Sequence, residues 1–347
     1  MSLNFFFHST NSIYFLQVSL QSAFLSADKN GNEKMWKYIV KRLLLIFVVL
    51  FGVTLVTFSA MHFAPGDPAE LIALARYGSD LSSEQIEAVR AMEKLESSVC
   101  IQYLKWMDQL LHLDFGKSLI SGDDILTEIL IRLPATVKLA FSSLCISLLI
   151  ALPAGILGAL HKNTFLGHAC VFGSLLGVSI PNFWLGVLFI WLFSLTLGFF
   201  PSFGYGGIEH LALPALTLGT SMAAVTTRLT RASMLEALDK EYIITARAKG
   251  LDERTVILKH ALKNALLPVA TFSGMQLGYL LGGAVVVETV FSWPGIGKLL
   301  VDSIFARDFS MVQGCVIFIA VLFSLSNLAV DLLYAFLDPR IRYEKHN

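Results

Sequence analysis

Long apolar runs alternate with polar segments along most of the chain. A helix needs about 20 mostly apolar residues to cross a hydrocarbon core about 30 Å thick. Runs of that length predict six transmembrane helices, at 39–63, 135–160, 169–198, 211–228, 265–290 and 311–337. The fourth run is short and rich in Gly, Ala, Ser and Thr, which suits a helix packed tightly against others. The pattern predicts an all-α integral membrane protein.

Composition agrees with this fold class. Of 347 residues, 55% are hydrophobic and 15% are charged, whereas soluble domains have about 25% charged residues. Lys plus Arg equals Asp plus Glu at 26 each, so net charge gives no reason to expect a nucleic-acid partner. The four Cys form no C-x-x-C pair and the eight His form no i, i+4 pair. These residues are therefore interpreted as core or surface side chains, and no metal site is expected.

The distribution of basic residues predicts the orientation in the membrane. The loop from Arg228 to Asn264 holds eight Lys or Arg, whereas the loop at 199–210 holds none. Basic loops stay in the cytoplasm, so both termini are expected to be cytoplasmic. The segment 64–134, with twelve acids against six bases, is then extracytoplasmic.

The ends and the long outer loop have patterns of their own. Polar residues interrupt 1–34 throughout, which predicts a poorly ordered extension or a segment ahead of a true start at Met35. In the outer loop, Ser82 or Ser83 is a candidate N-cap. It precedes apolar residues at helical spacing: Ile86, Val89, Met92 and Leu95. We expect a small helical region on the outer face; the alternative is a solvated helical hairpin without a binding role.

The stretch EYIITARAKGLDERTVILKHALKN, residues 241–264, is highly charged for its place between two apolar runs. Its pattern predicts two short helices joined by a turn. Gly250 suits the left-handed residue that follows a helix, and Asp252 suits the N-cap of a second helix starting at Glu253. The apolar positions are Leu235, Leu238, Tyr242 and Ile243 for the first helix, and Val256, Ile257, Ala261 and Leu262 for the second. The alternative is a basic loop that only fixes orientation.

T-A-R-A-K-G-L followed by H-A-L-K-N resembles the cytoplasmic coupling loop of ABC importer permeases. The form is that of the dipeptide, oligopeptide and nickel permease family. Further stretches that carry the resemblance are APGDP (64–68), DFGKSL (114–119), LPATVKLA (133–140), SIPNFWLG (179–186), LPALTLG (213–219), ETVFSWPGIGKLL (288–300) and LDPRIR (337–342). Together they extend from about Met35 to Tyr343.

The resemblance implies a division of the chain and a set of partners. Residues 35–134 form the first helix and outer loop, 135–343 form the permease core with the coupling loop at 229–264, and 344–347 form a tail. The expected partners are a homologous permease subunit, two ATPase subunits and an extracytoplasmic solute-binding protein, in the inner membrane of a prokaryote. The residues expected to contact an ATPase subunit are Thr245, Ala246, Arg247, Ala248, Lys249, Gly250, Leu251, His260, Leu262 and Asn264.

The sequence carries no nucleotide-binding P-loop. The motif G-x-x-x-x-G-K-[ST] fails at Gly116-Lys117 and at Gly297-Lys298, because no Gly stands five positions earlier. ATP and Mg²⁺ are thus expected in partner subunits, with no cofactor on this chain and no enzyme activity. The expected mechanism is alternating access for small peptides or nickel. The alternatives are an ion-coupled secondary transporter, which predicts inverted repeats and midspan charges, and a membrane enzyme.

Three prolines, Pro153, Pro181 and Pro268, fall in or beside predicted spans and are expected to kink them. The candidate residues of the translocation path are Ser179, Pro181, Asn182, Trp184 and Glu288. For the kink the alternative is a packing role, and for Glu288 it is an interfacial acid that binds nearby backbone. Phe291 and Trp293 are expected at the membrane interface.

Overall fold

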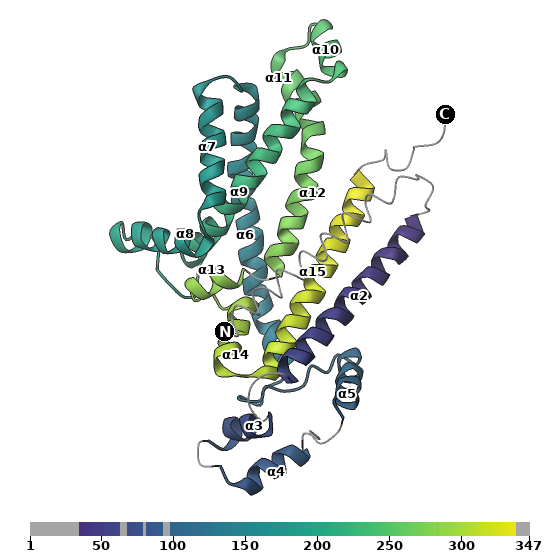
Figure 1. The fold of residues 1–347 in the computed structure, drawn as a ribbon. Helices are drawn as coiled ribbons and strands as arrows, with labels where there is room; N and C mark the ends of the chain where they lie inside the picture. The colour runs from purple at the N-terminus through teal and green to yellow at the C-terminus, as the bar shows by residue number, and fades with distance from the viewer. Residues whose placement is uncertain (1–34, 63–67, 79–80, 93–97, 283, 338–347) are drawn as a thin grey trace. The chain divides into compact units, whose positions relative to one another are not determined.

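The computed structural model describes residues 35–62, 68–78, 81–92, 98–282 and 284–337 (Figure 1). The predicted extension at 1–34, the tail at 344–347, LDPRIR after Leu337 and most of APGDP lie outside these residues. Helices make up nearly all regular structure in the described part, and Lys117 and Asp124 form an isolated β-bridge. The all-α fold is therefore confirmed.

The chain divides into two compact units, one of 1–65 with 332–347, and one of 66–331. In the first unit, helix α2 (Met35–His62) covers the first predicted span, and Val40–Ala60 is long and apolar enough to cross a membrane. Thr57 donates its hydroxyl to the carbonyl of Val53 at 2.7 Å. The polar side chain is thereby satisfied within the helix.

In the second unit, α6 (Ile125–Leu160) packs along α9 (Ile208–Leu238), and small residues allow the close approach. A Cβ on Gly155 of α6 would lie 2.5 Å from the Cβ of Thr230 on α9. One on Gly219 of α9 would lie 2.7 Å from Ile146 of α6. The tight packing predicted for the fourth span is confirmed.

The other predicted spans match helices with different bounds. Helices α6, α9 and α15 (Phe309–Leu337) are long and apolar enough to cross a membrane, as is α2. The third span is α7 (Phe165–Ser179) followed by α8 (Asn182–Phe189) and the π-helical η1 (Ile190–Thr196). Helix α7 and the segment formed by α8 and η1 meet at an angle of 103°. The fifth predicted span contains the 20-residue α12 (Leu262–Leu281). Among the described residues, α12 is not one of the helices long and apolar enough to cross a membrane. The count of six stays a prediction.

Proline affects these helices unequally. Pro153 lies inside α6 and Pro268 inside α12, and both helices continue through them. The sharp break comes only at Pro181, between α7 and α8. The expected kink is thus confirmed at Pro181, and at Pro153 and Pro268 it stays a prediction.

The predicted outer loop is largely helical where it is described. It contains α3 (Pro68–Tyr77), α4 (Ser83–Met92) and α5 (Val99–Leu111). The Ser82 hydroxyl accepts from the Gln85 N–H at 3.3 Å, and the Gln85 side chain accepts from the Ser82 N–H at 2.9 Å. This reciprocal capping box confirms Ser82 as the N-cap. Val89 is buried, Met92 is exposed, and Leu95 lies outside the described residues.

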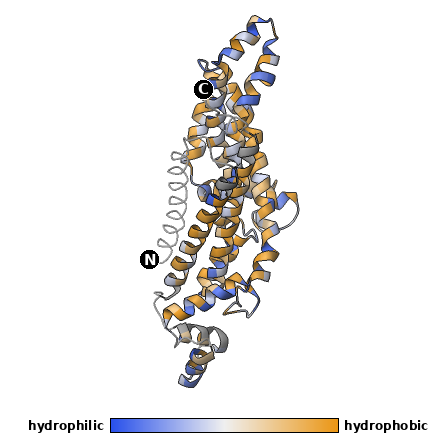
Figure 2. Cartoon of the chain, turned by 90° about the vertical axis from the view of Figure 1, so that its right-hand side faces the viewer, coloured by the Kyte–Doolittle hydropathy of each residue, from blue (hydrophilic) through white to orange (hydrophobic). Residues whose placement is uncertain are grey.

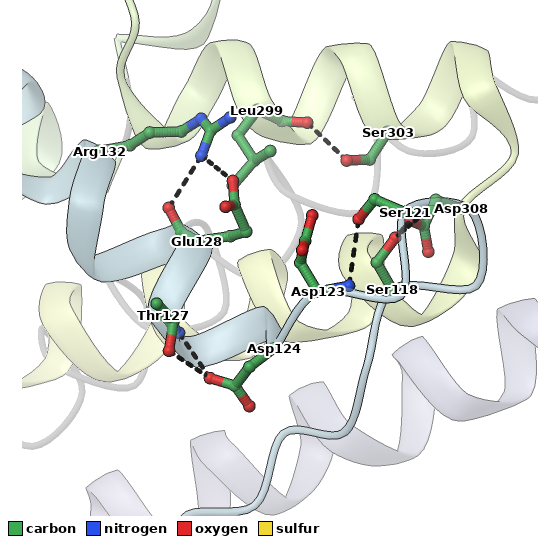
Figure 3. A network of polar contacts seen from close by, with 10 residues as sticks. All are labelled: Ser118, Ser121, Asp123, Asp124, Thr127, Glu128, Arg132, Leu299, Ser303 and Asp308. Atoms are coloured by element: carbon green, nitrogen blue, oxygen red, sulfur yellow. Dashed lines mark hydrogen bonds and ion pairs between the residues drawn. The ribbon is translucent and has the colours of Figure 1, made fainter.

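A polar network joins the start of α6 to the start of α15 (Figure 3). Asp308 accepts from the Ser118 hydroxyl at 2.5 Å and from the Met311 N–H at 3.1 Å. Asp124 caps α6 by accepting from the N–H and hydroxyl of Thr127, which lowers the pKa of its carboxyl. The DFGKSL stretch is thus fixed to the start of α15.

The last part of the unit contains two short helices, α13 (Val285–Val290) and α14 (Ile296–Ala306). Phe291 and Trp293, in the turn between them, are 2% and 1% exposed. They belong to the apolar core formed with α6 and α9. Both rings are thus buried in protein, because the turn folds back onto the helices, and their place at the membrane interface stays a prediction.

Candidate functional site

The charged stretch after α9 forms a compact elbow, residues 239–264, at the opposite end of the α9 and α12 helices from α13 (Figure 1). Figure 2 shows hydrophilic residues gathered on it, beyond the mainly hydrophobic helices. Helix α10 (Glu241–Ala248) has Lys249 as its C-cap and is followed by Gly250, whose φ is +75°. The Gly250 N–H bonds to the Arg247 carbonyl at 2.9 Å, and the Leu251 N–H to that of Ala246 at 3.4 Å. This Schellman motif explains why glycine stands there.

The second half of the elbow differs from the prediction in one respect. Asp252 accepts from the Arg254 N–H at 3.2 Å and caps α11 (Glu253–Thr255), as expected. However, α11 continues through the π-helical η2 (Val256–Ala261) directly into α12. The elbow thus has one separate short helix, α10, and a second arm that is the start of α12. The predicted stripe is also divided, because Leu235 and Leu238 belong to α9.

A small apolar cluster packs the elbow against the long helices α6, α9 and α12. Ile243, Val256 and Ala261 have no exposed surface, and Ala246 is 6% exposed. They pack with Ala159, Met234, Ala237 and Ala265, and Ile257 and Leu262 lie against them. The cluster joins α10 to α6, α9 and α12, so the elbow can move only together with these helices.

Two polar contacts close the elbow at its surface. The Arg247 guanidinium donates to the two carboxylate oxygens of Glu253 at 2.6 and 3.2 Å. This bond raises the pKa of Arg247 and lowers that of Glu253. The Asn264 amide donates to the Tyr242 hydroxyl at 3.0 Å, which joins α10 to α12. The geometry holds α10 at a fixed angle to the start of α12.

Some of the predicted coupling residues are exposed, and the others are buried or half-buried. Seven of them are exposed: Thr245, Arg247, Ala248, Lys249, Gly250, Leu251 and Asn264. Ala246 is buried, and His260 and Leu262 are half-buried. Ile244 and Leu258, 62% and 61% exposed, were missed by the sequence reasoning. The sequence feature that could have identified them is an apolar side chain within a highly charged stretch. The elbow surface is thus apolar as well as basic.

Hydrogen bonds do not link the predicted path residues into one cluster in the described part of the chain, although α13, which carries Glu288, packs against α8. Ser179 donates to the carbonyl of Leu175 at 2.9 Å, and Trp184 is 49% exposed beside the break at Pro181. Asn182 begins α8 and is half-buried. Glu288 lies on α13 and is fully buried. Its side-chain hydrogen bonds go to α6 and α14, and in the described part of the chain none joins it to the four residues at the break.

The Glu288 carboxylate is enclosed by protein. It accepts from the Thr136 hydroxyl and from the Lys298 N–H, both at 2.9 Å. A Cβ on Gly297 would lie 2.8 Å from it, and one on Gly295 would overlap it. The Thr136 oxygen in turn accepts from the Ile296 N–H at 2.9 Å. The acid therefore caps the first turn of α14, where the helix dipole favours negative charge.

Among the described residues, no group of three or more His, Cys, Asp or Glu is placed to hold a metal ion. The elbow is thus characterised by its fixed geometry and its charged surface. Sequence comparison then decides the family. The profile described as "Binding-protein-dependent transport system inner membrane component" matches residues 151–343, and a companion N-terminal profile matches 35–140. The chain belongs to this family.

Similar permeases support the assignment over nearly the whole chain. The chain is 41% identical over 310 residues to the glutathione transport system permease protein GsiC of Escherichia coli (strain K12). It is 40% identical over 322 residues to the oligopeptide transport system permease protein AppB of Bacillus subtilis (strain 168). Each match covers 89% of this chain and 100% of the relative. The predicted family is confirmed.

A solved structure is similar in fold. An inward-facing form of the MetNI methionine ABC transporter aligns with a TM-score of 0.54 at 19% identity. The alignment covers 62% of this chain and 98% of that chain. This permease is therefore a multi-pass inner-membrane subunit of a transport system and not an enzyme.

Proposed function

We propose that this permease forms half of the translocation path of an ABC importer for small peptides, including glutathione-like tripeptides. Two separate ATPase subunits drive it by alternating access, a homologous permease forms the other half, and a solute-binding protein delivers cargo from outside. Both termini are cytoplasmic. The names of the relatives, a glutathione permease and an oligopeptide permease, support this cargo class.

The observation that carries the proposal is the elbow. A Schellman turn at Gly250 and the ion pair between Arg247 and Glu253 hold α10 at a fixed angle. Below them, the buried apolar cluster connects α10 to three long helices. A rigid element of this kind transmits a push without deforming. Its surface carries apolar side chains and bases such as Lys249 and Arg254, which suit a partner groove lined with acids.

The candidate coupling residues follow from this arrangement. Seven exposed residues (Thr245, Arg247, Ala248, Lys249, Gly250, Leu251 and Asn264) face the ATPase subunit, and Ala246, His260 and Leu262 support them. For the path, the break between α7 and α8, with Ser179, Pro181, Asn182 and Trp184, lies beside the cargo route. Glu288 contributes to the path indirectly, by holding α14 in place, since its carboxylate is enclosed.

The test compares two proline substitutions. Gly250 and Gly122 both have a φ near +75° with open space around them, and both donate their N–H to a nearby carbonyl. Gly250→Pro changes the elbow, and Gly122→Pro changes the outer loop. We expect Gly250→Pro to abolish co-purification of the ATPase subunits and ATP-dependent uptake, with the permease still in the membrane. Gly122→Pro should retain the ATPase subunits.

Cargo is tested with the complete transporter in proteoliposomes, using radiolabelled glutathione, a dipeptide and Ni²⁺. ATP-dependent uptake of the peptides is expected. Uptake of Ni²⁺ alone would contradict the cargo class and leave the ATP-driven mechanism standing. Uptake without ATPase subunits would instead favour an ion-coupled secondary transporter.

A further inference from the structure

Lys138 is a charged residue within the apolar helix α6 and inside the predicted span 135–160. Its side chain is exposed. The ammonium donates to the Tyr205 hydroxyl at 3.1 Å and lies 5.6 Å from the centre of that ring. No carboxylate in the described part of the chain comes within ion-pair distance of it. An uncompensated charge in a membrane helix is expensive, and such residues mark substrate or ion paths.

Tyr205 is held in place by the core of the second unit. Its ring packs edge-on against Trp293 with centroids 4.8 Å apart. The buried Trp293 indole N–H donates to the Ala135 carbonyl at 2.9 Å. Ala135 is on the same helix as Lys138 and three residues away, hence on a similar face. The neighbouring Gly204 N–H donates to the Phe291 carbonyl at 3.0 Å. The loop that carries Tyr205 is thus fixed at two points.

Glu288 fixes the turn between α13 and α14, which carries the Trp293 ring that packs against Tyr205. Its carboxylate bonds to the Thr136 hydroxyl on α6 and to the Lys298 N–H on α14. Its carbonyl accepts from the Trp293 N–H at 2.8 Å. The turn therefore cannot shift along α6 without breaking buried bonds. Lys138 and Tyr205 form a preorganised pair on a rigid support.

The chemistry of the pair suits a carboxylate. A Lys ammonium has three N–H donors, and one of them is used by Tyr205. The Tyr205 hydroxyl, which accepts from Lys138, keeps its own proton to donate. An anion beside the pair could receive bonds from both groups. A metal cation would be repelled by the ammonium.

We propose that Lys138 and Tyr205 bind a carboxylate of the peptide cargo as it passes through the permease. The inference rests on the proposed peptide cargo and names the chemical group that is recognised. A lipid phosphate carries the same charge. A lysine that serves lipid extends freely toward the headgroups, whereas this ammonium is held at the hydroxyl of a fixed tyrosine, which favours a ligand at a defined position.

The experiment uses the complete transporter in proteoliposomes with a radiolabelled tripeptide and its C-terminal amide. The amide keeps the length and side chains of the peptide and removes the carboxylate. Affinity of both for the solute-binding protein is measured separately by calorimetry, so that selection in the permease is isolated. The variants are Lys138→Gln, Lys138→Arg as the charge-retaining control, and Tyr205→Phe.

Lys138→Gln is expected to raise KM for the acid about tenfold or more, with kcat and the KM for the amide nearly unchanged. Lys138→Arg should restore most of the preference for the acid, and Tyr205→Phe should lose a smaller part of it. If Lys138→Gln does not reach the membrane, Tyr205→Phe provides the measurement, since it keeps the ring against Trp293.

An acid-to-amide ratio of KM values that is the same in the wild type and in the variants overturns the proposal. An equal effect on acid and amide that follows the fraction of anionic lipid assigns the pair to lipid and also overturns it. Failure of the wild type to take up either peptide with ATP refutes the proposed function itself, and the outcomes are thereby distinguishable.

Discussion

The elbow and the turn between α13 and α14 each place a glutamate close to a glycine-containing turn, but the two acids have opposite surroundings. Glu253 is 55% exposed and paired with the Arg247 guanidinium. Glu288 is fully buried and bonds to a hydroxyl and a backbone N–H. An exposed pair contributes little stability because water competes for both charges. A buried acid that satisfies buried donors is structural.

The two sites therefore differ in which substitutions they tolerate. At the elbow, stability comes from the apolar cluster around Ile243 and Val256, so its surface charges are free to serve a partner. At the α13–α14 turn, the polar groups themselves hold the structure. The sharpest tests therefore measure stability and transport in the same variants.

The largest effect is expected for Glu288→Ala. The substitution leaves the Lys298 N–H and the Thr136 hydroxyl without their acceptor and opens a cavity. We expect a loss of about 3 kcal/mol in the free energy of unfolding. The melting temperature of the detergent-solubilised protein measures it. Glu253→Ala is the matched control and should leave the melting temperature unchanged while it reduces ATP-dependent uptake. Equal melting temperatures for the two variants would remove the contrast between the sites.

A smaller effect is expected for Gly295→Ala, which adds one methyl group against the Glu288 carboxylate. Gly295 has a φ of −93°, so the backbone accepts alanine and only the overlap opposes it. We expect a loss of about 2 kcal/mol from overpacking.

The control for this overlap is Gly173→Ala on α7, where a Cβ would meet nothing within 4 Å. That change should be neutral or slightly stabilising, because alanine favours helix. The two melting temperatures are compared in the same detergent. A Gly295→Ala protein as stable as Gly173→Ala would mean that the turn has room for Glu288 to move.

Local signals made the elbow and the outer helix predictable. Gly250, Asp252 and Ser82 each act on backbone groups within a few residues, so their roles can be inferred from the neighbouring sequence. The burial of Trp293 could not be inferred, because its partner Ala135 is 158 residues away. An aromatic residue beside an apolar run looks the same at a membrane interface and in a core.

The same limit applies to the proline at the break. Pro153 and Pro181 both follow apolar residues in predicted spans, yet α6 continues through the first and the chain turns by 103° at the second. Packing decides between these outcomes. Gly155, close to Pro153, sits directly against Thr230 of α9, so α6 packs tightly against its neighbour where it continues past the proline. The candidate path residues could thus be chosen from the sequence, but their three-dimensional arrangement could not be predicted from it.

The smallest effect on stability, and the most specific effect on transport, is expected at the ion pair of the elbow. Arg247→Glu and Glu253→Arg should each place like charges across the turn and reduce uptake per ATP hydrolysed several-fold. The double variant Arg247→Glu/Glu253→Arg restores the attraction and should recover much of the coupling if the pair acts by fixing the angle of α10. If Arg247 acts instead by touching the ATPase subunit, the double variant should stay as defective as Arg247→Glu.

The pH dependence of this pair has a defined sign. The hydrogen-bonded contact between the two groups lowers the folded-state pKa of Glu253 and raises that of Arg247 above its ordinary value. The carboxylate's contribution is therefore present above its ordinary pKa and lost as pH falls through the lowered one. The guanidinium's contribution is present below its ordinary pKa and lost only as pH rises through the raised one. Between about pH 6 and 8 the pair stays fully ionised. Coupling measured in proteoliposomes across that interval should not change through this pair, whereas about 0.5 M salt should weaken it by screening the exposed charges.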